Sequence, residues 1–422
     1  MEEEVPCYFL CPISLQMMRD PVTLPTGITY DRDGIERWLL TGAGTCPLTK
    51  QAVPADCEPT PNHTLRRLIQ AWCELHLIPK QPAAGDEIAI RPPTDRARVA
   101  ALVSRIADAA QEGSHQEQLL AGLRELRDVA AESERNRQLI AAAPGAVDAL
   151  AAVLVFASNV DKAAVACGCD EALEIMVSLR LSEQRLARVV ETNESLVLVD
   201  ALVSALGRSN VASRERAAQL LADVTAVMSP ATNRLASQVF REATQLLRDR
   251  PSKAATKAAL RVLVGATPWG RNRVKAVDAG AVPALVETLL DSPVERRVCE
   301  LALAALERLC GCAEGRAELV AHAGGVAAVG ARALRVSEAA TDKAVRVLRS
   351  VSRHAATPAV LQEMAHTGVV AALCLVATEH HQFGGRTRER ARETLRLHAK
   401  HWTSTSPCLH HHLRAMYPPS SS

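Results

Sequence analysis

A repeat of fixed length in the second half of the chain restricts the fold more than any other feature. Val282, Val326 and Val370 each lie two residues after a glycine, and the copies are spaced 44 residues apart. The sequence around them is dominated by Ala, Leu, Val and Arg and lacks the alternation of a strand. An all-helical period of about 40 to 47 residues is typical of arrays in which each unit buries its apolar face only against its neighbours.

Weaker copies of the same pattern lie nearer the amino terminus, at residues 144–147 and 199–202. We interpret the glycine as a sharp turn from a short helix into a long one, which resembles armadillo repeats more than HEAT repeats. Residues 94–402 are therefore expected to form an all-α armadillo-repeat superhelix with a concave surface that binds protein. In one repeat the second and third helices should cover residues 283–290 and 298–306. Four charged residues beside or on that third helix either face the groove or lie on an ordinary solvated face: Glu295, Arg296, Glu300 and Glu307.

The first 76 residues have a different character, because Cys-Pro steps begin two short segments there, 11–14 and 46–50. Cys-Pro loops are frequent in zinc-bound RING fingers, whose zinc ions each need four Cys or His ligands. This region offers seven candidates and no Cys-x-x-Cys pair: Cys7, Cys11, Cys46, Cys57, His63, Cys73 and His76. Two closed tetrahedral zinc sites therefore cannot be built, and we expect no metal site.

Short elements are expected to hold this region together without metal. Residues 22–30 predict a hairpin with its turn at 25–27, residues 31–40 predict a helix capped by Asp31 or Asp33, and a second helix should follow Asn62. The expected inward faces are apolar: Ile35, Trp38 and Leu39 on the first helix, and Leu65, Leu68, Ile69 and Trp72 on the second. Five of the eleven Phe, Trp and Tyr residues of the chain lie here, and buried rings can replace a metal staple in a small domain.

These landmarks, with Tyr30-Asp31-Arg32 between them and Pro61-Asn62-His63-Thr64-Leu65 after them, resemble the U-box, the zinc-free relative of the RING finger. The expected order is a U-box at 5–78, a Pro-rich linker at 79–93, an armadillo-type array at 94–402 and a tail at 403–422. The fold class is mainly α, with a small α+β U-box followed by an all-α superhelix. This layout, together with His401-Trp402 near the end, is similar to the plant U-box/armadillo ubiquitin ligases, one branch of which is associated with stress and immune signalling.

The resemblance implies a RING-type E3 ubiquitin transferase with no cofactor and no covalent ubiquitin intermediate. The U-box would bind a ubiquitin-conjugating enzyme charged with ubiquitin, and the array would hold a protein substrate, so that proximity promotes transfer. The implied docking residues are Ile13 and Leu15 in the first loop, Trp38 on the helix, Pro47 in the second loop, and Lys50, where related domains often carry Arg. Trp38 also belongs to the inward face of its helix, so core packing stays open for it. Cys11 and Cys46 lack a nearby base and are expected to be neither ligands nor nucleophiles.

Charge and hydropathy limit the alternatives. A net charge of +2 gives no electrostatic case for nucleic acid. The most apolar window, 139–160, is broken by Pro144-Gly145 and predicts two buried helices rather than a membrane span. The acidic amino terminus and the free cysteines predict a cytoplasmic protein, and the nucleus stays open. The pairs Cys167/Cys169 and Cys310/Cys312 are expected to be buried thiols. A U-box homodimer and an armadillo scaffold without transfer activity also stay open.

Overall fold

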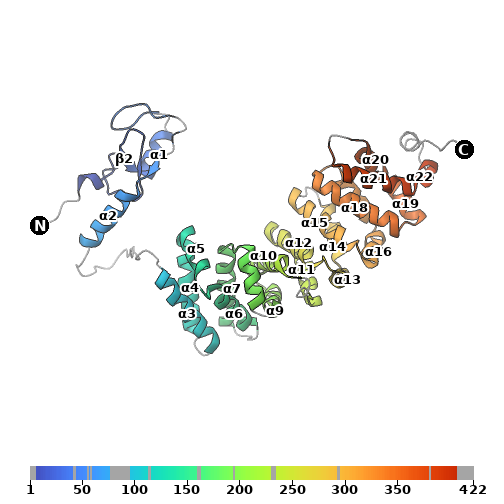
Figure 1. Cartoon of the computed structure of the whole chain (residues 1–422), viewed down its shortest axis with the longest axis horizontal. Helices are drawn as coiled ribbons and strands as arrows, with labels where there is room; N and C mark the ends of the chain where they lie inside the picture. The colour runs from blue at the N-terminus through green and yellow to red at the C-terminus, as the bar shows by residue number, and fades with distance from the viewer. Residues whose placement is uncertain are drawn as a thin grey trace. The chain divides into compact units, whose positions relative to one another are not determined.

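The computed structural model describes residues 6–40, 44–54, 57, 59–76, 96–112, 116–158, 163–192, 195–229, 234–291, 295–379 and 382–405. The chain divides into two compact units, Met1–Ile90 and Arg91–Ser422, and Figure 1 shows both. The predicted linker at 79–93 and the predicted tail from residue 406 onward lie outside the described residues.

The amino-terminal unit is a small α+β fold, as the sequence predicts. Its elements are a 3-10 helix (Cys7–Phe9), β1 (Pro21–Thr23), β2 (Thr29–Asp31), α1 (Arg32–Leu40), β3 (Thr60–Pro61) and α2 (His63–His76). The three strands form one antiparallel sheet in the order β2-β1-β3, in which Val22 lies opposite both Tyr30 and Pro61. The predicted hairpin is confirmed, with Gly27 at a φ of 81° in its turn. The two-residue strand β3 was not predicted.

Large side chains fill the centre of this unit. Tyr30 and Ile35 are fully buried, and the Phe9 ring meets the Trp72 ring edge to face with 6.0 Å between centroids. Trp38 and Leu39 pack half-buried against the same core. Four of the five rings therefore lie in or against the interior that the sequence assigned to them, whereas Tyr8 is 65% exposed.

Two local predictions in this unit were wrong. The Asp31 side chain serves the preceding loop rather than the start of α1, because its Oδ1 accepts hydrogen bonds from the backbone N–H groups of Arg19 and Asp20 at 3.1 and 2.8 Å. Leu68 lies on the exposed side of α2, although its spacing placed it on the inward face. The cap of α2 is confirmed, since the Asn62 Oδ1 accepts the Leu65 N–H at 3.0 Å.

The second unit is built from repeats of up to three helices, and its described residues contain no strand. The first helices of the repeats are α5 (Glu134–Ala142), α8 (Glu183–Thr192), α13 (Gly270–Asp278), α16 (Ala313–Ala321) and α19 (Pro358–His366). The second helices are α3 (Arg96–Glu112), α6 (Ala146–Ser158), α9 (Ser195–Leu206), α11 (Ser237–Asp249), α14 (Ala281–Leu290), α17 (Gly325–Arg332) and α20 (Val369–Thr378). The third helices are α4 (Gln116–Glu132), α7 (Ala163–Ser178), α10 (Val211–Val227), α12 (Lys253–Ala266), α15 (Arg296–Leu309), α18 (Glu338–His354) and α21 (Gly385–Leu397).

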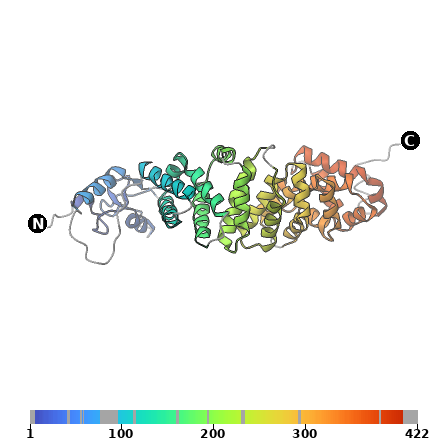
Figure 2. The ribbon, with the colours of Figure 1, turned by 90° about the horizontal axis from the view of Figure 1, so that it is seen from below.

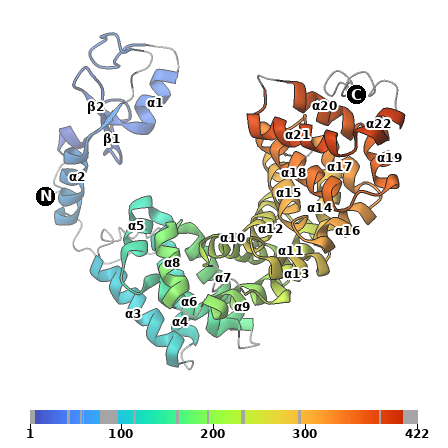
Figure 3. The ribbon, with the colours of Figure 1, turned by 45° about the vertical axis from the view of Figure 1, so that its right-hand side comes forward.

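Like helices stack on like helices along the array. Each third helix contacts the third helix of the next repeat, and the second helices do the same. Figures 1 and 2 show the repeats following one another in sequence order. In Figure 3 the third helices α10, α12, α15, α18 and α21 lie along the inside of the bend of the array, and α13, α16 and α19 lie on the opposite side. We call the row of third helices the inner row.

Glycine turns join the first and second helices, as the repeat predicted. Three of them have φ between 74° and 79°: Gly145, Gly280 and Gly368. The helices on either side meet at 83° for α5 and α6 and at 71° for α19 and α20. Val282, Val326 and Val370 each occupy the second position of the helix that follows, which confirms the repeat. The helix after the turn is not the long one, however, because α13 and α14 have 9 and 10 residues whereas α15 has 14.

The described part of the most apolar window, residues 139–158, falls on α5 and α6, which confirms two helices separated by a turn. Within the described part of the chain, no single helix has the length and apolar character of a membrane span. Two bent pairs, α5 with α6 and α19 with α20, have them only when both helices are counted together.

One repeat departs from the pattern. The described residues between α10 and α11 form no first helix. At Gly265 of α12 an added Cβ would lie 2.8 Å from the Thr225 Oγ1 of α10, so these two helices touch closely there. The preceding first helix, α8, contacts α9 and α10, whereas α5, α13, α16 and α19 each contact the second helix of the repeat before them. The helix α8 is therefore displaced toward the inner row.

A final helix, α22 (Ala399–Thr405), covers the carboxy-terminal end of the stack and contacts α19. Its Trp402 is fully buried, and the indole Nε1 donates to the Leu361 carbonyl oxygen at 3.2 Å. The ring also meets the His398 ring edge to face at 5.7 Å, and the His398 Nε2 lies 2.7 Å from the Ser352 carbonyl oxygen. This cap supplies the apolar partner that a last repeat would otherwise lack.

Candidate functional site

Two loops of the amino-terminal unit share one backbone design. In the first loop, residues 10–17, the Cys11 N–H donates to the Gln16 carbonyl oxygen at 2.8 Å. The Leu15 N–H donates back to the Cys11 carbonyl oxygen, also at 2.8 Å. Leu15 takes a left-handed conformation with a φ of 56°, which costs a residue with a Cβ about 1–2 kcal/mol.

The second loop, residues 45–52, repeats this design. The Cys46 N–H donates to the Gln51 carbonyl oxygen at 2.8 Å, and the Lys50 N–H donates to the Cys46 carbonyl oxygen at 2.9 Å. Lys50 takes the same left-handed conformation, with a φ of 59°. Cys-Pro-Ile-Ser-Leu-Gln and Cys-Pro-Leu-Thr-Lys-Gln are therefore structural equivalents, residue by residue.

The Cys11 thiol lies at the centre of the first loop and is fully buried. Its sulfur accepts a hydrogen bond from the Asp31 backbone N–H at 3.3 Å, which joins the loop to the start of α1. Burial raises the pKa of this thiol, but hydrogen bonds from Asp31, Ser14 and Ile13 outweigh burial and bring the pKa below its usual value. Ser14 stands where a Cys-x-x-Cys zinc pair would carry its second cysteine, so hydrogen bonds to one sulfur close this loop.

Cys46 has the same role in the second loop, with Thr49 in the position of Ser14. The Tyr30 hydroxyl lies 3.0 Å from the Cys46 sulfur and accepts the Leu48 N–H at 3.2 Å. Burial raises the pKa of Cys46, but polar contacts with Thr26, Thr49 and Tyr30 lower it to about 6. Burial and the Cys46 sulfur raise the pKa of Tyr30 to about 12. Both loop sulfurs are buried, so neither is placed to attack a thioester on another protein.

The first loop presents two of the predicted docking residues. Leu15 is 75% exposed and Ile13 is 36% exposed. Ile13 also packs over Gly34 near the start of α1, because its Cδ1 would lie 3.8 Å from a Cβ added at that glycine. The first loop is thus seated on α1 and directs an apolar surface to solvent.

Trp38 joins the other predicted docking residues to α1. It is half-buried, and its Nε1 donates to the Thr45 carbonyl oxygen at 2.8 Å, which fixes the second loop to the helix. The Lys50 Nζ lies 5.8 Å from the centroid of the Trp38 ring, a cation–π contact, and Pro47 is half-buried in the same loop. The ring therefore packs against the core and supports the second loop, and its docking role stays a prediction.

One residue of this surface was missed. Leu48 is 59% exposed and is the structural equivalent of Ile13. The sequence contained the signal, because Cys-Pro-Leu-Thr repeats Cys-Pro-Ile-Ser with apolar and hydroxyl residues in the same places. We call the exposed side chains of Ile13, Leu15 and Leu48, with Trp38 and Lys50, the loop face.

The inner row of the second unit has a regular electrostatic feature. Every step between its neighbouring helices is joined by an ion pair of described residues, from α4 to α21. The pairs are Arg127–Glu171 (2.6 Å), Arg216–Glu174 (3.0 Å), Arg261–Asp223 (2.6 Å), Lys257–Glu295 (2.7 Å), Arg346–Glu307 (3.4 Å) and Arg390–Asp342 (2.7 Å). Much of the charge on this row is therefore neutralised between repeats.

Most of the charged candidates near α15 are also bound to a neighbouring repeat. Glu295 and Glu307 form two of the pairs above, and Glu300 accepts a hydrogen bond from the Ser337 hydroxyl of the next repeat at 2.8 Å. Only Arg296 has a mostly solvated side chain, which is 73% exposed. The three carboxylates hold repeats together, and they leave little free charge for a ligand at this point of the groove.

The cysteines of the second unit behave as buried thiols where they are described. Burial raises the pKa of Cys169 to about 11 and that of Cys310 to about 12, and it also raises the pKa of the half-buried Cys312. The side chain of Cys167 lies outside the described residues. Among the residues that the structure describes, no three His, Cys, Asp or Glu side chains are grouped as metal ligands.

Comparison with known proteins agrees with both units. The U-box domain family matches residues 5–78, and the plant U-box protein ARM repeat region matches residues 98–417. "E3 ubiquitin-protein ligase PUB23" of Arabidopsis thaliana is 42% identical over 424 residues, covering 99% of this chain and 98% of that protein. "E3 ubiquitin-protein ligase PUB22" of the same plant is 38% identical over 99% of both chains. "U-box domain-containing protein 75" of Oryza sativa subsp. japonica is 32% identical over 96% of this chain and 84% of that protein. With these full-length similarities, the chain belongs to the plant U-box proteins that carry an armadillo repeat region.

Proposed function

We propose that this protein is a ubiquitin ligase whose U-box docks a ubiquitin-conjugating enzyme charged with ubiquitin, and whose armadillo array holds the protein substrate. The observation that carries the proposal is the loop face, where Ile13, Leu15 and Leu48 are exposed around the half-buried Trp38. Exposed apolar clusters on a small domain serve as anchors of protein interfaces. The names of PUB22 and PUB23 support the same activity for this chain.

The transfer we propose has no covalent intermediate on this protein. The amine of a substrate lysine attacks the thioester carbonyl on the conjugating enzyme, an isopeptide bond forms, and the thiol of that enzyme leaves. Burial of Cys11 and Cys46 supports this route, since neither sulfur is accessible to a thioester. The contribution of the ligase is to hold the two reactants together and to restrict the thioester to a reactive geometry.

Lys50 has a separate role in this proposal. Its ammonium group lies over the edge of the loop face, held near the Trp38 ring in a left-handed backbone conformation. We assign it to hydrogen bonding with the docked conjugating enzyme and its ubiquitin. A lysine donates as a point charge and cannot form the planar paired contacts of an arginine.

Two further aspects of the proposal have separate grounds. We propose a role in plant stress or immune signalling from family resemblance, and a location in the cytoplasm from the free cysteines, with the nucleus left open. The rival function is an armadillo adaptor without transfer activity. The two functions differ in whether the loop face supports release of ubiquitin from a charged conjugating enzyme.

A lysine-discharge assay separates these functions. Full-length protein is mixed with ubiquitin-charged conjugating enzymes and free lysine, and the loss of thioester is followed on non-reducing gels. Ile13→Ala and Trp38→Ala are expected to slow discharge at least tenfold, because removing an interface anchor costs about 2 kcal/mol or more. Leu68→Ala is the matched control, since Leu68 is an exposed leucine of the same unit outside the loops. No acceleration by the wild-type protein with any of a broad panel of conjugating enzymes would favour the adaptor.

A further inference from the structure

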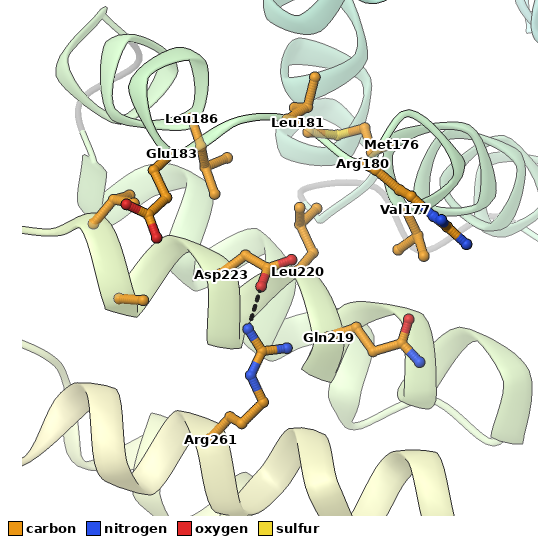
Figure 4. A pocket seen from close by; sticks show the side chains of 12 residues that line it. Met176, Val177, Arg180, Leu181, Glu183, Leu186, Gln219, Leu220, Asp223 and Arg261 are labelled. Atoms are coloured by element: carbon orange, nitrogen blue, oxygen red, sulfur yellow. Dashed lines mark hydrogen bonds and ion pairs between the residues drawn. The ribbon is translucent and has the colours of Figure 1, made fainter. Parts of the chain in front are cut away.

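A pocket opens on the inner row beside the irregular repeat. It has a volume of about 480 Å³, and its walls come from the end of α7, the start of α8, the second half of α10 and one side chain of α12. Figure 4 shows the ion pair between Asp223 and Arg261, one of the steps of the inner row, across this pocket. The pocket therefore lies on the surface that the proposed function gives to the substrate.

The floor of the pocket is apolar. Met176, Leu186 and Leu220 are buried, and Val177, Leu181 and Val227 are half-buried around them. The displaced helix α8 forms one wall through Leu186, and α7 and α10 form the other walls. A volume within the range of about 300–1,000 Å³ is typical of ligand pockets, and an apolar floor favours a bulky apolar group.

The rim carries two charged residues that differ from the paired charges of the inner row. Arg180 and Glu183 are both exposed, and neither side chain makes a hydrogen bond or salt bridge to the described residues; the Arg180 side chain acts on Glu134 only through a longer-range electrostatic attraction. On the inner row itself, ion pairs between repeats neutralise much of the charge. In Figure 4 Arg180 and Glu183 lie on opposite sides of the pocket, with the apolar side chains between them.

We propose that this pocket is an anchor subsite for an extended segment of a protein substrate. A bulky apolar side chain of that segment enters the pocket, a basic residue on one side of it pairs with Glu183, and an acidic residue on the other side pairs with Arg180. The apolar anchor supplies most of the affinity, and the two rim charges fix the direction of the chain, because complementary charges select orientation more than strength. The inference rests on the proposed function in assigning substrate recruitment to the array.

Labelled peptides test the subsite directly on the full-length protein. Three peptides share one composition around a central phenylalanine: one with lysine before and glutamate after it, one with the two charges exchanged, and one with serine in place of phenylalanine. Fluorescence anisotropy is expected to give one preferred charge order and binding weaker by about tenfold or more without the ring, the loss expected when an apolar side chain leaves its pocket. Equal binding of all three peptides would overturn the proposal, and so would equal binding of free phenylalanine amide, which would indicate a small-molecule site.

Two sets of variants locate the binding. Ala226 lines the pocket but is exposed, so Ala226→Phe fills the pocket without disturbing the core and is expected to weaken the preferred peptide about tenfold. Ala121→Phe is the matched control, because Ala121 is an exposed alanine of the inner row on α4, outside the pocket. The double exchange of Arg180→Glu with Glu183→Arg is expected to reverse the preferred charge order. An unchanged order in that variant, or equal loss in the Ala121 control, would show that the peptides bind elsewhere.

Lysine discharge, measured in the same preparations, keeps this inference distinct from the proposed function. Active discharge without selective peptide binding overturns the subsite and leaves the ligase function standing. Selective peptide binding without discharge supports the subsite and overturns the transfer activity.

Discussion

The carboxy-terminal cap gives the most quantitative prediction. Trp402→Ala removes a fully buried indole, which costs about 3–5 kcal/mol for the truncated ring. It also leaves the Leu361 carbonyl oxygen without its donor at 3.2 Å, which adds about 1 kcal/mol. Trp402→Phe keeps most of the apolar ring and loses the donor, so its expected cost is only about 1–2 kcal/mol.

The location of the damage matters as much as its size. Repeat arrays are stabilised by each unit and its nearest neighbours, so the loss should concentrate in α19 to α22 and fade toward α3. Hydrogen exchange of the full-length variant, read by mass spectrometry, measures this gradient. Trp269→Ala is the control, because Trp269 is 41% exposed and its truncation should affect exchange little.

Two results would refute this reasoning. Uniform acceleration of exchange from α3 to α22 would mean that the array unfolds as one unit, and unchanged exchange in α19 would mean that the ring does not stabilise the last repeat. Lysine discharge by the U-box should stay intact in Trp402→Ala, because the two compact units have separate cores.

Three further predictions concern single side chains. Gly265→Ala should destabilise the array by about 1–3 kcal/mol in urea titrations, because the new methyl group meets the Thr225 Oγ1 at 2.8 Å, and adding Thr225→Ala should recover most of the loss. Alkylation of the native protein at pH 8 should label the exposed Cys7 quickly and should spare Cys46 until the protein unfolds. The pKa of about 6 would favour reaction of the Cys46 thiol, but its burial blocks the reagent. Fast labelling of Cys46 would contradict its burial. Leu48→Ala should weaken binding of the conjugating enzyme roughly five- to thirtyfold in calorimetry, because burying the 59% exposed part of this leucine corresponds to about 1–2 kcal/mol. Unchanged affinity would show that Leu48 does not contact the conjugating enzyme.

Features set by local sequence could be predicted. The glycine at the turn and the valine two residues later follow from backbone freedom and from the apolar face of the next helix, and both recur at 280–282, 324–326 and 368–370. The Asn62 cap and the hairpin turn at Gly27 are equally local. In the loop face, the two Cys-Pro loops could be identified for the same reason.

Features set by tertiary contacts could not be predicted. The period of α2 places Leu68 inward, but a helix that packs on a small unit buries only a narrow stripe of its surface, and Leu68 falls outside that stripe. Asp31 reads as a cap because its spacing fits, yet the backbone N–H groups of Arg19 and Asp20, distant in sequence, bind it instead.

The ion pairs of the inner row bear on how an array of similar helices avoids mis-stacking as it folds. Apolar contacts alone would tolerate a skipped repeat, because the third helix of one repeat offers much the same surface as the third helix of another. The signs of the charges oppose this error at α7: α4 presents Arg127 to its successor, and α10 presents Arg216 to its predecessor. Joining α4 directly to α10 would bring two guanidinium groups together and leave the carboxylates of α7 without their partners. The same conflict of like charges would follow from skipping α12 or α15, whereas skipping α10 or α18 would still bring opposite charges together, so the order of charges penalises some of the stacking errors open to a repetitive chain.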